Sequence, residues 1–150
     1  MKFKIILVLS LVMMTTFTSN SDASQQVASP NGQLAIEFHF QSFETPFPSG
    51  EYLAYSIRYK DRVIFSPSPI QILLSEGNPI GMSLEVIDSY QRSINEVSEP
   101  IYGKTKFLRD HCNELHLLLI EKNEPFRQIK LVARAYDDAV AFRLSLPRQP

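Results

Sequence analysis

The sequence predicts an all-β protein with the architecture of an antiparallel β-sandwich. Several short segments alternate apolar and polar residues with a period of two, which places one face of each segment against a core. Clusters of Pro, Gly, Asn and Asp separate these segments, and no segment has the 3.6-residue apolar period of an amphipathic helix. About eight short strands with frequent turn signals are typical of a two-layered sandwich.

The first half of the chain contains two clear alternating strands. An Asn-Gly turn at residues 31–32 precedes a predicted strand over 34–40, in which every second residue is apolar. A second strand is predicted over 53–59, and it forms a hairpin with residues 63–65 across a short polar connection. Because proline has no amide hydrogen for a sheet, the Ser-Pro-Ser-Pro run at 66–69 ends this hairpin.

The middle of the chain has weaker signals. Residues 70–75 form a short apolar run, and residues 84–91 alternate loosely. Residues 92–113 are mostly polar and include a proline and a glycine, so they predict a long connection with one short strand near 105–108.

The last third is the most strand-like part of the sequence. Residues 115–120 are nearly all apolar, which suits a central strand buried on both faces. Strands over 129–135 and 140–146 alternate and flank a tight turn at Asp137-Asp138. Because the last strand is strongly apolar and needs neighbours on both sides, we expect an incomplete sandwich whose natural structure continues beyond residue 150.

The N-terminus has the three-part pattern of a secretory signal peptide. Lys2 and Lys4 precede an apolar run over residues 5–14, and small residues at Ser21 and Ala23 form a cleavage site. The apolar run is about half of the ~20 residues that a membrane span needs. We therefore expect residues 1–23 to be a signal peptide cleaved after Ala23, and the mature chain, residues 24–150, to be periplasmic or secreted and free of the membrane.

Composition excludes several classes of protein. The chain has 150 residues with 15 Lys and Arg against 16 Asp and Glu, so it lacks the basic surplus of a nucleic-acid-binding domain. It is too short for a barrel enzyme of about 250 residues. A single Cys, Cys112, forms neither an internal disulfide nor a Cys-based zinc site, and in an oxidising compartment we expect it to be buried and inert.

One short segment gathers metal-ligand residue types: His111, Cys112, Glu114 and His116. The two histidines are five residues apart, which is not a helical i, i+4 pair and points to opposite faces of a strand. The favoured interpretation is therefore a turn that leads into a strand. The third histidine, His39, lies on the polar face of the predicted strand over 34–40.

Two carboxylate pairs are further candidates. Asp137 and Asp138 supply oxygen atoms of the kind that calcium prefers, but aspartates in tight turns more often accept bonds from local amides. Glu96 and Glu99 match the residue types of a glycosidase pair, but on a polar loop they are typical of solvated surface. No Gly-x-Ser-x-Gly, phosphate-binding glycine loop or His-Glu-x-x-His motif is present. The residues thus predict no catalytic, cofactor or metal site.

Tyrosines are the remaining candidates for a binding role. Tyr52, Tyr55 and Tyr59 stack on sugar rings if they are exposed. The alternative is that Tyr55 and Tyr59 share the inner face of their strand with Leu53 and Ile57, as part of the core or its edge.

Four segments, in order, resemble the N-terminal domain of glycoside hydrolase family 97, a family of exported α-glucosidases and α-galactosidases. The most specific is Arg134-Ala-Tyr-Asp-Asp-Ala-Val-Ala-Phe-Arg143, and the matches span nearly all of the expected mature chain. The other three are Ser29-Pro-Asn-Gly-Gln-Leu34, Tyr55-Ser-Ile-Arg-Tyr-Lys60 with Val63-Ile64, and Tyr102-Gly103 followed by Arg109-Asp-His-Cys-Asn-Glu-Leu115.

Two positions depart from the family pattern. Ala139 stands where the family usually has Gly, and if this position needs a positive φ, Ala adds about 1 kcal/mol of strain. Cys112 stands where an aromatic residue is common, which thins the packing there.

The resemblance implies a galactose-mutarotase-like super-sandwich that packs against a catalytic (β/α)8 barrel. In the family the barrel carries the acid and base carboxylates, and calcium binds where the barrel meets the sandwich. Those carboxylates lie downstream of this chain, so no catalytic or calcium residue is assigned to any position here, and the chain is expected to hold no cofactor.

Three hypotheses for function follow. The favoured one is the N-terminal β-sandwich of an exported α-glycosidase, which supports the barrel and part of the pocket for an oligosaccharide or α-glycoside and is catalytically silent alone. The second is a freestanding carbohydrate-binding module. The third is a non-functional remnant of a disrupted gene. The second needs exposed aromatic residues on one sheet face, from Tyr52, Tyr55, Tyr59, Tyr90 or Tyr102.

Overall fold

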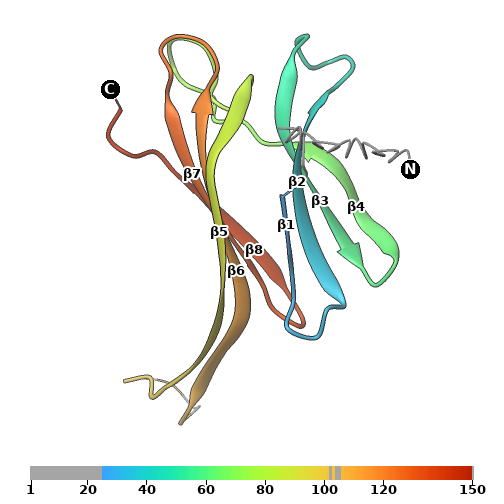
Figure 1. The fold of residues 1–150 in the computed structure, drawn as a ribbon, viewed down its shortest axis with the longest axis vertical. Coiled ribbons are helices and arrows are strands. Elements are labelled where there is room, and N and C mark those ends of the chain that lie inside the picture. The colour runs from blue at the N-terminus through green and yellow to red at the C-terminus, as the bar shows by residue number, and fades with distance from the viewer. Residues whose placement is uncertain (1–24, 102, 104–105, 150) are drawn as a thin grey trace, which may run out of the picture.

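A computed structural model describes residues 25–101, 103 and 106–149 of the chain, so the predicted signal peptide lies outside the described residues. The described part has no helix and forms two four-stranded antiparallel sheets that face each other (Figure 1), which confirms the predicted β-sandwich. No helix in this part is long and apolar enough to cross a membrane.

The first sheet contains β1 (Gln25–Ala28), β2 (Leu34–Ser42), β3 (Glu51–Tyr59) and β4 (Arg62–Pro69). The second contains β5 (Leu84–Ser98), β6 (Leu108–Glu121), β7 (Gln128–Ala135) and β8 (Val140–Ser145).

In each sheet the strands lie side by side in chain order, so every strand pairs with its sequence neighbour. Alternation then sorts the side chains, because residues i, i+2 and i+4 of a strand point to one face. Apolar residues of β1, β2, β3, β5, β6 and β7, with Ile70 and Ile80 of the connection between the sheets, meet between the sheets and form the core. Its buried members are Val27, Ile36, Phe38, Leu53, Ile70, Ile80, Leu84, Leu115, Leu117, Leu119, Ile129, Leu131, Ala133 and Ala135.

One side of the sandwich, between β1 and the β5–β6 pair, is joined by side-chain hydrogen bonds. Ser89 Oγ donates to Gln25 Oε1 at 2.8 Å, and Gln91 Nε2 donates to the carbonyl of Gln26 at 2.9 Å. Asn113 Nδ2 donates to the carbonyl of Ala28, also at 2.9 Å. Polar residues of the two sheets therefore connect them along this side.

The opposite side, where β4 and β8 are the edge strands, is lined by aromatic rings. Phe142 of β8 packs against Phe38 and Tyr55 of the first sheet, with ring centroids 5.8 and 5.1 Å apart. Tyr55 in turn stacks on Phe65 of β4 at 5.5 Å. Apolar residues of β4, including Val63, are exposed next to this aromatic row.

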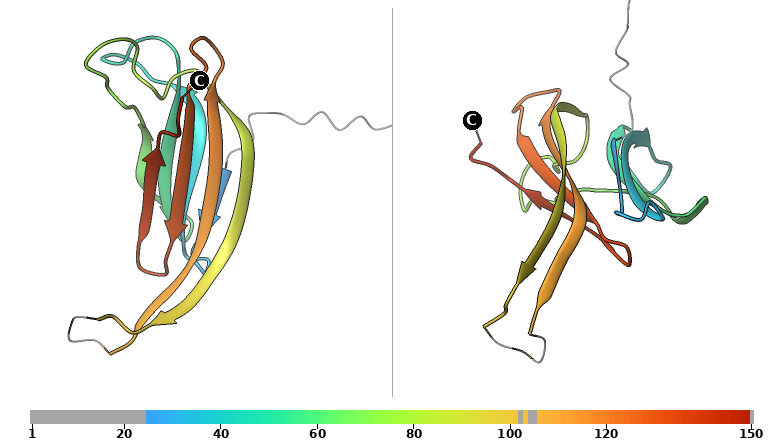
Figure 2. Two further views of the ribbon diagram at one scale, coloured as in Figure 1. Left: turned by 90° about the vertical axis from the view of Figure 1, so that its left-hand side faces the viewer. Right: turned by 60° about the horizontal axis from the view of Figure 1, so that its bottom comes forward.

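The prediction of a long loop over residues 92–113 was wrong. Residues 92–98 continue β5 and residues 108–113 begin β6, and the two strands form a long hairpin that extends past the rest of the sandwich (Figures 1 and 2). Its end is a two-stranded ribbon with few apolar partners on either face, so most of its residues are exposed. Without a buried face, no apolar alternation marks these strand residues in the sequence.

Three further segments differ from what the sequence pattern suggests. Residues 115–120 are not buried on both faces, since Leu118 and Ile120 are only half-buried on the face away from the first sheet. Residues 70–75 form no strand, only an isolated bridge between Ile72 and Ile80. A short strand, β1, lies in a segment that the sequence did not mark as a strand.

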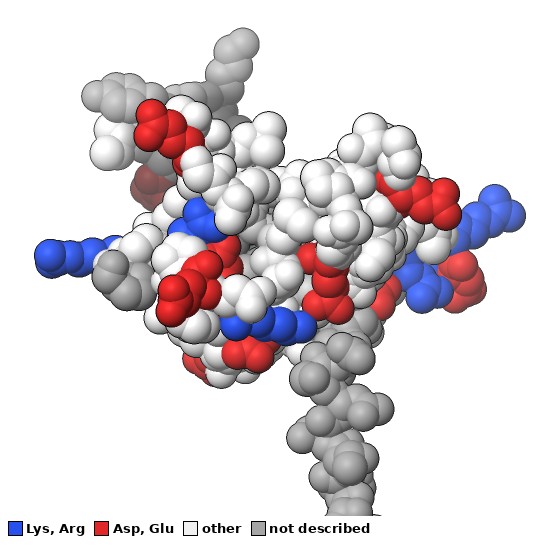
Figure 3. Space-filling view, turned by 90° about the horizontal axis from the view of Figure 1, so that it is seen from above, with Lys and Arg blue, Asp and Glu red and all other residues white. Residues whose placement is uncertain are grey.

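Two ion pairs lie near the end of β6 at Glu121. Arg127 NH2 lies 2.6 Å from Glu121 Oε1, and Lys122 Nζ lies 2.9 Å from Glu51 Oε2 of the other sheet. Acidic and basic side chains are interspersed among neutral ones in this view (Figure 3).

Candidate functional site

The polar residues with the densest set of contacts lie on the outer face of the second sheet, the face turned away from the first sheet. Leu115, Leu117 and Leu119 point into the core, so Glu114 and His116 between them point outward. The antiparallel register extends these positions into two cross-strand rows. One row is Arg92, Glu114, Arg134 and Ala141, and the other is Tyr90, His116, Val132 and Arg143.

Glu114 is the centre of the first row. Its side chain is 2% exposed, although it lies on an outer face, because neighbouring cations cover it. Arg92 Nε donates to Oε1 at 2.7 Å and Arg134 Nε donates to Oε2 at 2.5 Å. His116 Nε2 lies 2.5 Å from Oε1. Both carboxylate oxygens are therefore occupied by cationic or ring N–H donors.

This environment keeps Glu114 ionised. Burial alone would raise the pKa of the carboxyl group, but hydrogen bonds from His116, Arg134 and Arg92 outweigh burial and hold the pKa at about 2. Glu114 is thus a fixed negative charge at neutral pH and not a proton donor.

Glu114, Arg92, Arg134 and His116 form what we call the Glu114 cluster. Further contacts of Arg134 extend this cluster toward the free end of the β5–β6 hairpin. Arg134 NH1 donates to Asp110 Oδ2 at 3.1 Å and lies 3.4 Å from the hydroxyl of Tyr136. Cys112 is fully buried in the same region, as predicted, and burial raises the pKa of its thiol. Because the thiolate is the reactive form, the raised pKa favours the unreactive thiol.

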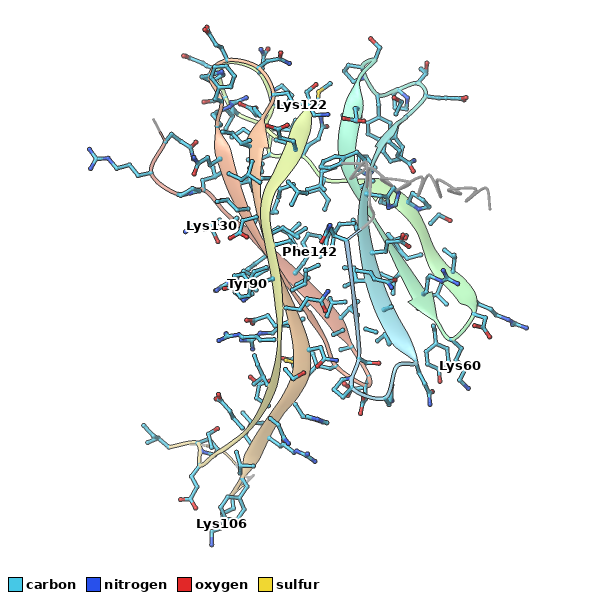
Figure 4. All side chains as sticks on the ribbon, viewed as in Figure 1. Lys60, Tyr90, Lys106, Lys122, Lys130 and Phe142 are labelled. Atoms are coloured by element: carbon cyan, nitrogen blue, oxygen red, sulfur yellow. The ribbon has the colours of Figure 1, made fainter. Side chains whose placement is uncertain are left out.

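An aromatic pair stands beside the cluster. Tyr90 and His116 are directly opposite each other on β5 and β6, and their rings stack with centroids 4.3 Å apart and an interplanar angle of 11°. Tyr90 is 52% exposed. In Figure 4, Tyr90 and Lys130 lie on the outer side of the second sheet, whereas Phe142 lies on the side of the first sheet.

Two shallow grooves run along this outer face and meet at Val132. The first, of about 300 Å³, is lined by Glu114, Val132, Arg134, Ala141, Phe142 and Arg143. The second, of about 260 Å³, is lined by Asp88, Tyr90, His116, Leu117, Leu118, Lys130, Leu131 and Val132. Together they place charged and aromatic side chains around a partly apolar floor, which is the usual composition of a small-ligand site.

The four residues of metal-ligand type all lie within β6, so the expected turn before the strand is wrong, and the strand separates them. His111 and His116 lie on one continuous strand, five residues apart, so they point to opposite faces. Only His116 joins the Glu114 cluster, while His39 Nε2 lies 3.0 Å from Gln41 Oε1 on the first sheet. In the described ranges no group of three or more His, Cys, Asp or Glu side chains is placed to hold a metal ion.

The two carboxylate pairs are also placed apart from the cluster. Asp137 Oδ1 accepts the backbone N–H of Asn31 at 2.9 Å, so it links the β7–β8 turn to the turn before β2 and not to a local amide. Glu96 is exposed near the end of β5, and Glu99 is exposed just beyond it.

Among the described tyrosines, Tyr90 is the most exposed residue. Tyr52 is fully buried, and its hydroxyl donates to the carbonyl of Pro48 at 2.7 Å. Tyr55 is half-buried in the aromatic row. Tyr59 is exposed, but its hydroxyl is 3.3 Å from Gln33 Oε1, and Tyr102 lies outside the described residues.

The departure at Ala139 has no cost in backbone strain. Positive φ at described non-glycine positions occurs at Lys60, Ser83 and Phe126, and Ala139 is not among them. The hairpin closes with the N–H of Tyr136 donating to the carbonyl of Ala139 at 2.7 Å.

The sequence did not single out Glu114 as the centre of a cluster. The available signal was a Glu-x-His pair at alternate positions of a strand whose other face is apolar. The pairing of Glu114 with Arg92 could not be predicted, because the sequence pattern around residue 92 indicates a loop and cross-strand neighbours depend on the register.

Known proteins match this chain along most of its length. The family model described as Glycosyl-hydrolase 97 N-terminal matches residues 27–150. A retaining alpha-galactosidase of Bacteroides thetaiotaomicron is 28% identical over 136 residues, which are 90% of this chain and 18% of that protein.

Solved structures share the fold. A Glycoside Hydrolase Family 97 enzyme from Pseudoalteromonas sp. strain K8, in complex with acarbose, aligns with a TM-score of 0.70 and 22% identity, covering 83% of this chain and 18% of that one. A beta-arabinopyranosidase aligns with a TM-score of 0.65 and 22% identity over the same shares. The chain thus spans less than a fifth of the length of these relatives.

Proposed function

Because the chain belongs to the Glycosyl-hydrolase 97 N-terminal family, we propose that it forms the N-terminal β-sandwich of an exported α-glycosidase. In this role it supports a catalytic barrel and one part of a sugar pocket, and it is catalytically silent by itself. The family match over residues 27–150 carries the proposal, and the shared sandwich fold supports it.

Three carboxylates held in ion pairs, those of Glu114, Glu121 and Glu51, support catalytic silence. Glycoside hydrolysis needs a protonated acid and a second carboxylate about 5–10 Å away across the scissile bond. Glu114 has a pKa of about 2 and both oxygens occupied, so it does not serve as the acid. Glu121 is engaged by Arg127, and Glu51 by Lys122. The proposal assigns no metal to residues of this chain.

We expect no hydrolysis of aryl α-glucosides or aryl α-galactosides by the purified 150-residue chain. The measurement is release of the aryl group over hours, with the retaining alpha-galactosidase of Bacteroides thetaiotaomicron as the positive control. If the chain hydrolyses either substrate, and a second, independently purified sample has the same activity, the silent role is overturned.

Export is the second part of the proposal, and it has its own measurement. When the gene is expressed in a Gram-negative host, we expect the protein recovered outside the cytoplasm to begin at residue 24. Intact-mass spectrometry distinguishes this product from the uncleaved chain. A protein that stays in the cytoplasm with residues 1–23 attached would contradict export.

One observation favours a second function, carbohydrate binding by the sandwich itself. Tyr90 is exposed, stacked on His116 and next to a groove, which are features of a platform for a sugar ring. We expect saccharides to change the tyrosine fluorescence of the protein, and the change to be absent in Tyr90→Ala. If glucans and galactosides produce no response, this second function is removed.

A further inference from the structure

Positive charge is concentrated on the β7–β8 half of the outer face. Lys130 and Arg134 of β7 and Arg143 of β8 all point outward there. Arg134 is neutralised by Glu114 and Asp110, but none of the ion pairs in the described ranges includes Lys130 or Arg143. Two cations without an acidic partner therefore border the place where the two grooves meet.

The register brings these cations close together around a small, partly apolar floor. Arg143 is directly opposite Val132, and Lys130 is directly opposite Ser145. Ala141 is directly opposite Arg134, so a short side chain separates Arg134 from Arg143. The 300 Å³ groove lies here, and Arg134, Arg143, Val132 and Ala141 are among the residues that line it.

The stacked pair of Tyr90 and His116 lies at one end of the cross-strand row that ends at Arg143. Tyr90, His116, Val132 and Arg143 occupy consecutive strands of one cross-strand row. Neighbouring strands are about 4.8 Å apart, so Tyr90 and Arg143 are separated by about 14 Å. A chain of two or three sugar rings has this length, so one molecule can contact both ends of the row.

We propose that this outer face binds saccharides that carry carboxylate groups, such as oligomers of uronic acids. The inference rests on the second function proposed above, carbohydrate binding, and names its ligand class. The Tyr90–His116 pair packs against a sugar ring, while Arg143 and Lys130 bind the carboxylates. Guanidinium groups match the two oxygens of a carboxylate, whereas a neutral sugar gains much less from unpaired cations.

The acidic groups on the face are compatible with an anionic ligand. The charge of Glu114 is already balanced by Arg92 and Arg134. Asp88 lies at the Tyr90 end of the second groove and Arg143 in the first. Asp88 therefore accepts hydrogen bonds from sugar hydroxyls, and the carboxylate lies nearer Arg143.

The test compares two disaccharides that differ only in the carboxylates, α-1,4-digalacturonic acid and α-1,4-galactobiose. Affinities are measured by calorimetry and by tyrosine fluorescence at 150 mM NaCl. We expect a dissociation constant of about 1 mM or below for digalacturonic acid, and binding at least about tenfold weaker for galactobiose. Equal affinities would overturn the acidic ligand class while leaving carbohydrate binding intact.

Variants locate the site. Arg143→Gln is expected to weaken digalacturonic acid binding by about tenfold, with Arg143→Lys in between because it keeps the charge but loses the planar fork. Arg62→Gln is the matched control, since Arg62 is exposed on β4 of the other sheet and is in no described ion pair. Unchanged binding in Arg143→Gln, or an equal loss in Arg62→Gln, would overturn the assignment.

A third measurement asks whether the carboxylates that bind this face belong to a saccharide or to a polypeptide. A hexaglutamate peptide is titrated under the same conditions, and we expect it to bind more weakly than digalacturonic acid. Tighter binding of the peptide would mean that the face receives an acidic polypeptide, and it would overturn the saccharide assignment. If neither disaccharide binds, both the acidic ligand class and carbohydrate binding by this domain are overturned. The catalytically silent role is not affected by this result, because the aryl glycoside assay tests it separately.

Discussion

Glu114→Gln is expected to lower the free energy of unfolding by about 3 kcal/mol at pH 7. The substitution keeps the size of the side chain but removes the charge that Arg92, Arg134 and His116 contact. Breaking a buried ion pair from one side costs about 3–5 kcal/mol, and the partial exposure of both arginines favours the lower end. Urea denaturation followed by far-UV circular dichroism measures the change.

The same carboxylate gives the protein a defined acid dependence. Its pKa is lowered from 4.5 to about 2 in the folded state, so its contribution to stability is fully present above pH 4.5 and is lost as the pH falls toward 2. A shift of this size corresponds to about 3 kcal/mol. We expect the stability curve of Glu114→Gln to lack this part of the decline.

Glu96→Gln is the control for both measurements. Glu96 is exposed near the end of β5 and is in no described ion pair, so we expect a change within about 0.5 kcal/mol. Equal stability of Glu114→Gln and the wild type at pH 7, or parallel acid curves, would contradict the role assigned to the cluster.

Leu131→Ala is expected to lower the free energy of unfolding by about 3–4 kcal/mol. Leu131 is fully buried at the centre of β7 and belongs to the core between the sheets. Removing its methyl groups loses burial and leaves a cavity that the two sheets only partly close. Urea denaturation again gives the difference, and the dependence of stability on urea is expected to keep its slope.

Leu73→Ala provides the comparison at the surface. Leu73 is 78% exposed in the connection between the two sheets, so the same chemical change is expected to cost less than about 0.5 kcal/mol. Similar losses for the two leucines would mean that the core does not lie between the sheets where the structure places it.

How far the sequence predicts the fold depends on burial. The strands over 34–40 and 129–135 are predictable because one face of each is buried and the alternation is clear. The strand over 53–59 alternates in sequence too, although in the structure both of its faces are buried at Leu53 and Ala54. Residues 92–98 and 108–113 pair as strands without a covering layer, so their pattern is polar and resembled a loop. Strand pairing alone leaves no apolar signature in a sequence.

The candidate site was less predictable than the fold, for a related reason. Glu114 and His116 are neighbours on one strand, but Arg92 and Arg134 come from residues about 20 positions away on either side. Only the strand register brings Glu114, His116, Arg92 and Arg134 together. Arg92 lies in the part of β5 that the sequence pattern indicates as a loop, so its pairing with Glu114 was not predictable. The resemblance to family 97 located the segments but not the contacts.

The chain order of the strands has a consequence for how the protein is divided. Residues 25–69 contain every strand of the first sheet, and residues 84–145 every strand of the second. The intervening segment pairs back onto β3 through Ile70, Gly81 and Ser83, and the carbonyl of Ser83 also accepts the N–H of Lys122 after β6, so the segment contacts both halves. A nick at the exposed bend around Gly77 leaves each pairing between named strands within one of the two fragments. The second fragment then carries Gly81 and Ser83, which pair with β3 of the first, so the two fragments would reassemble through these contacts and their apolar faces.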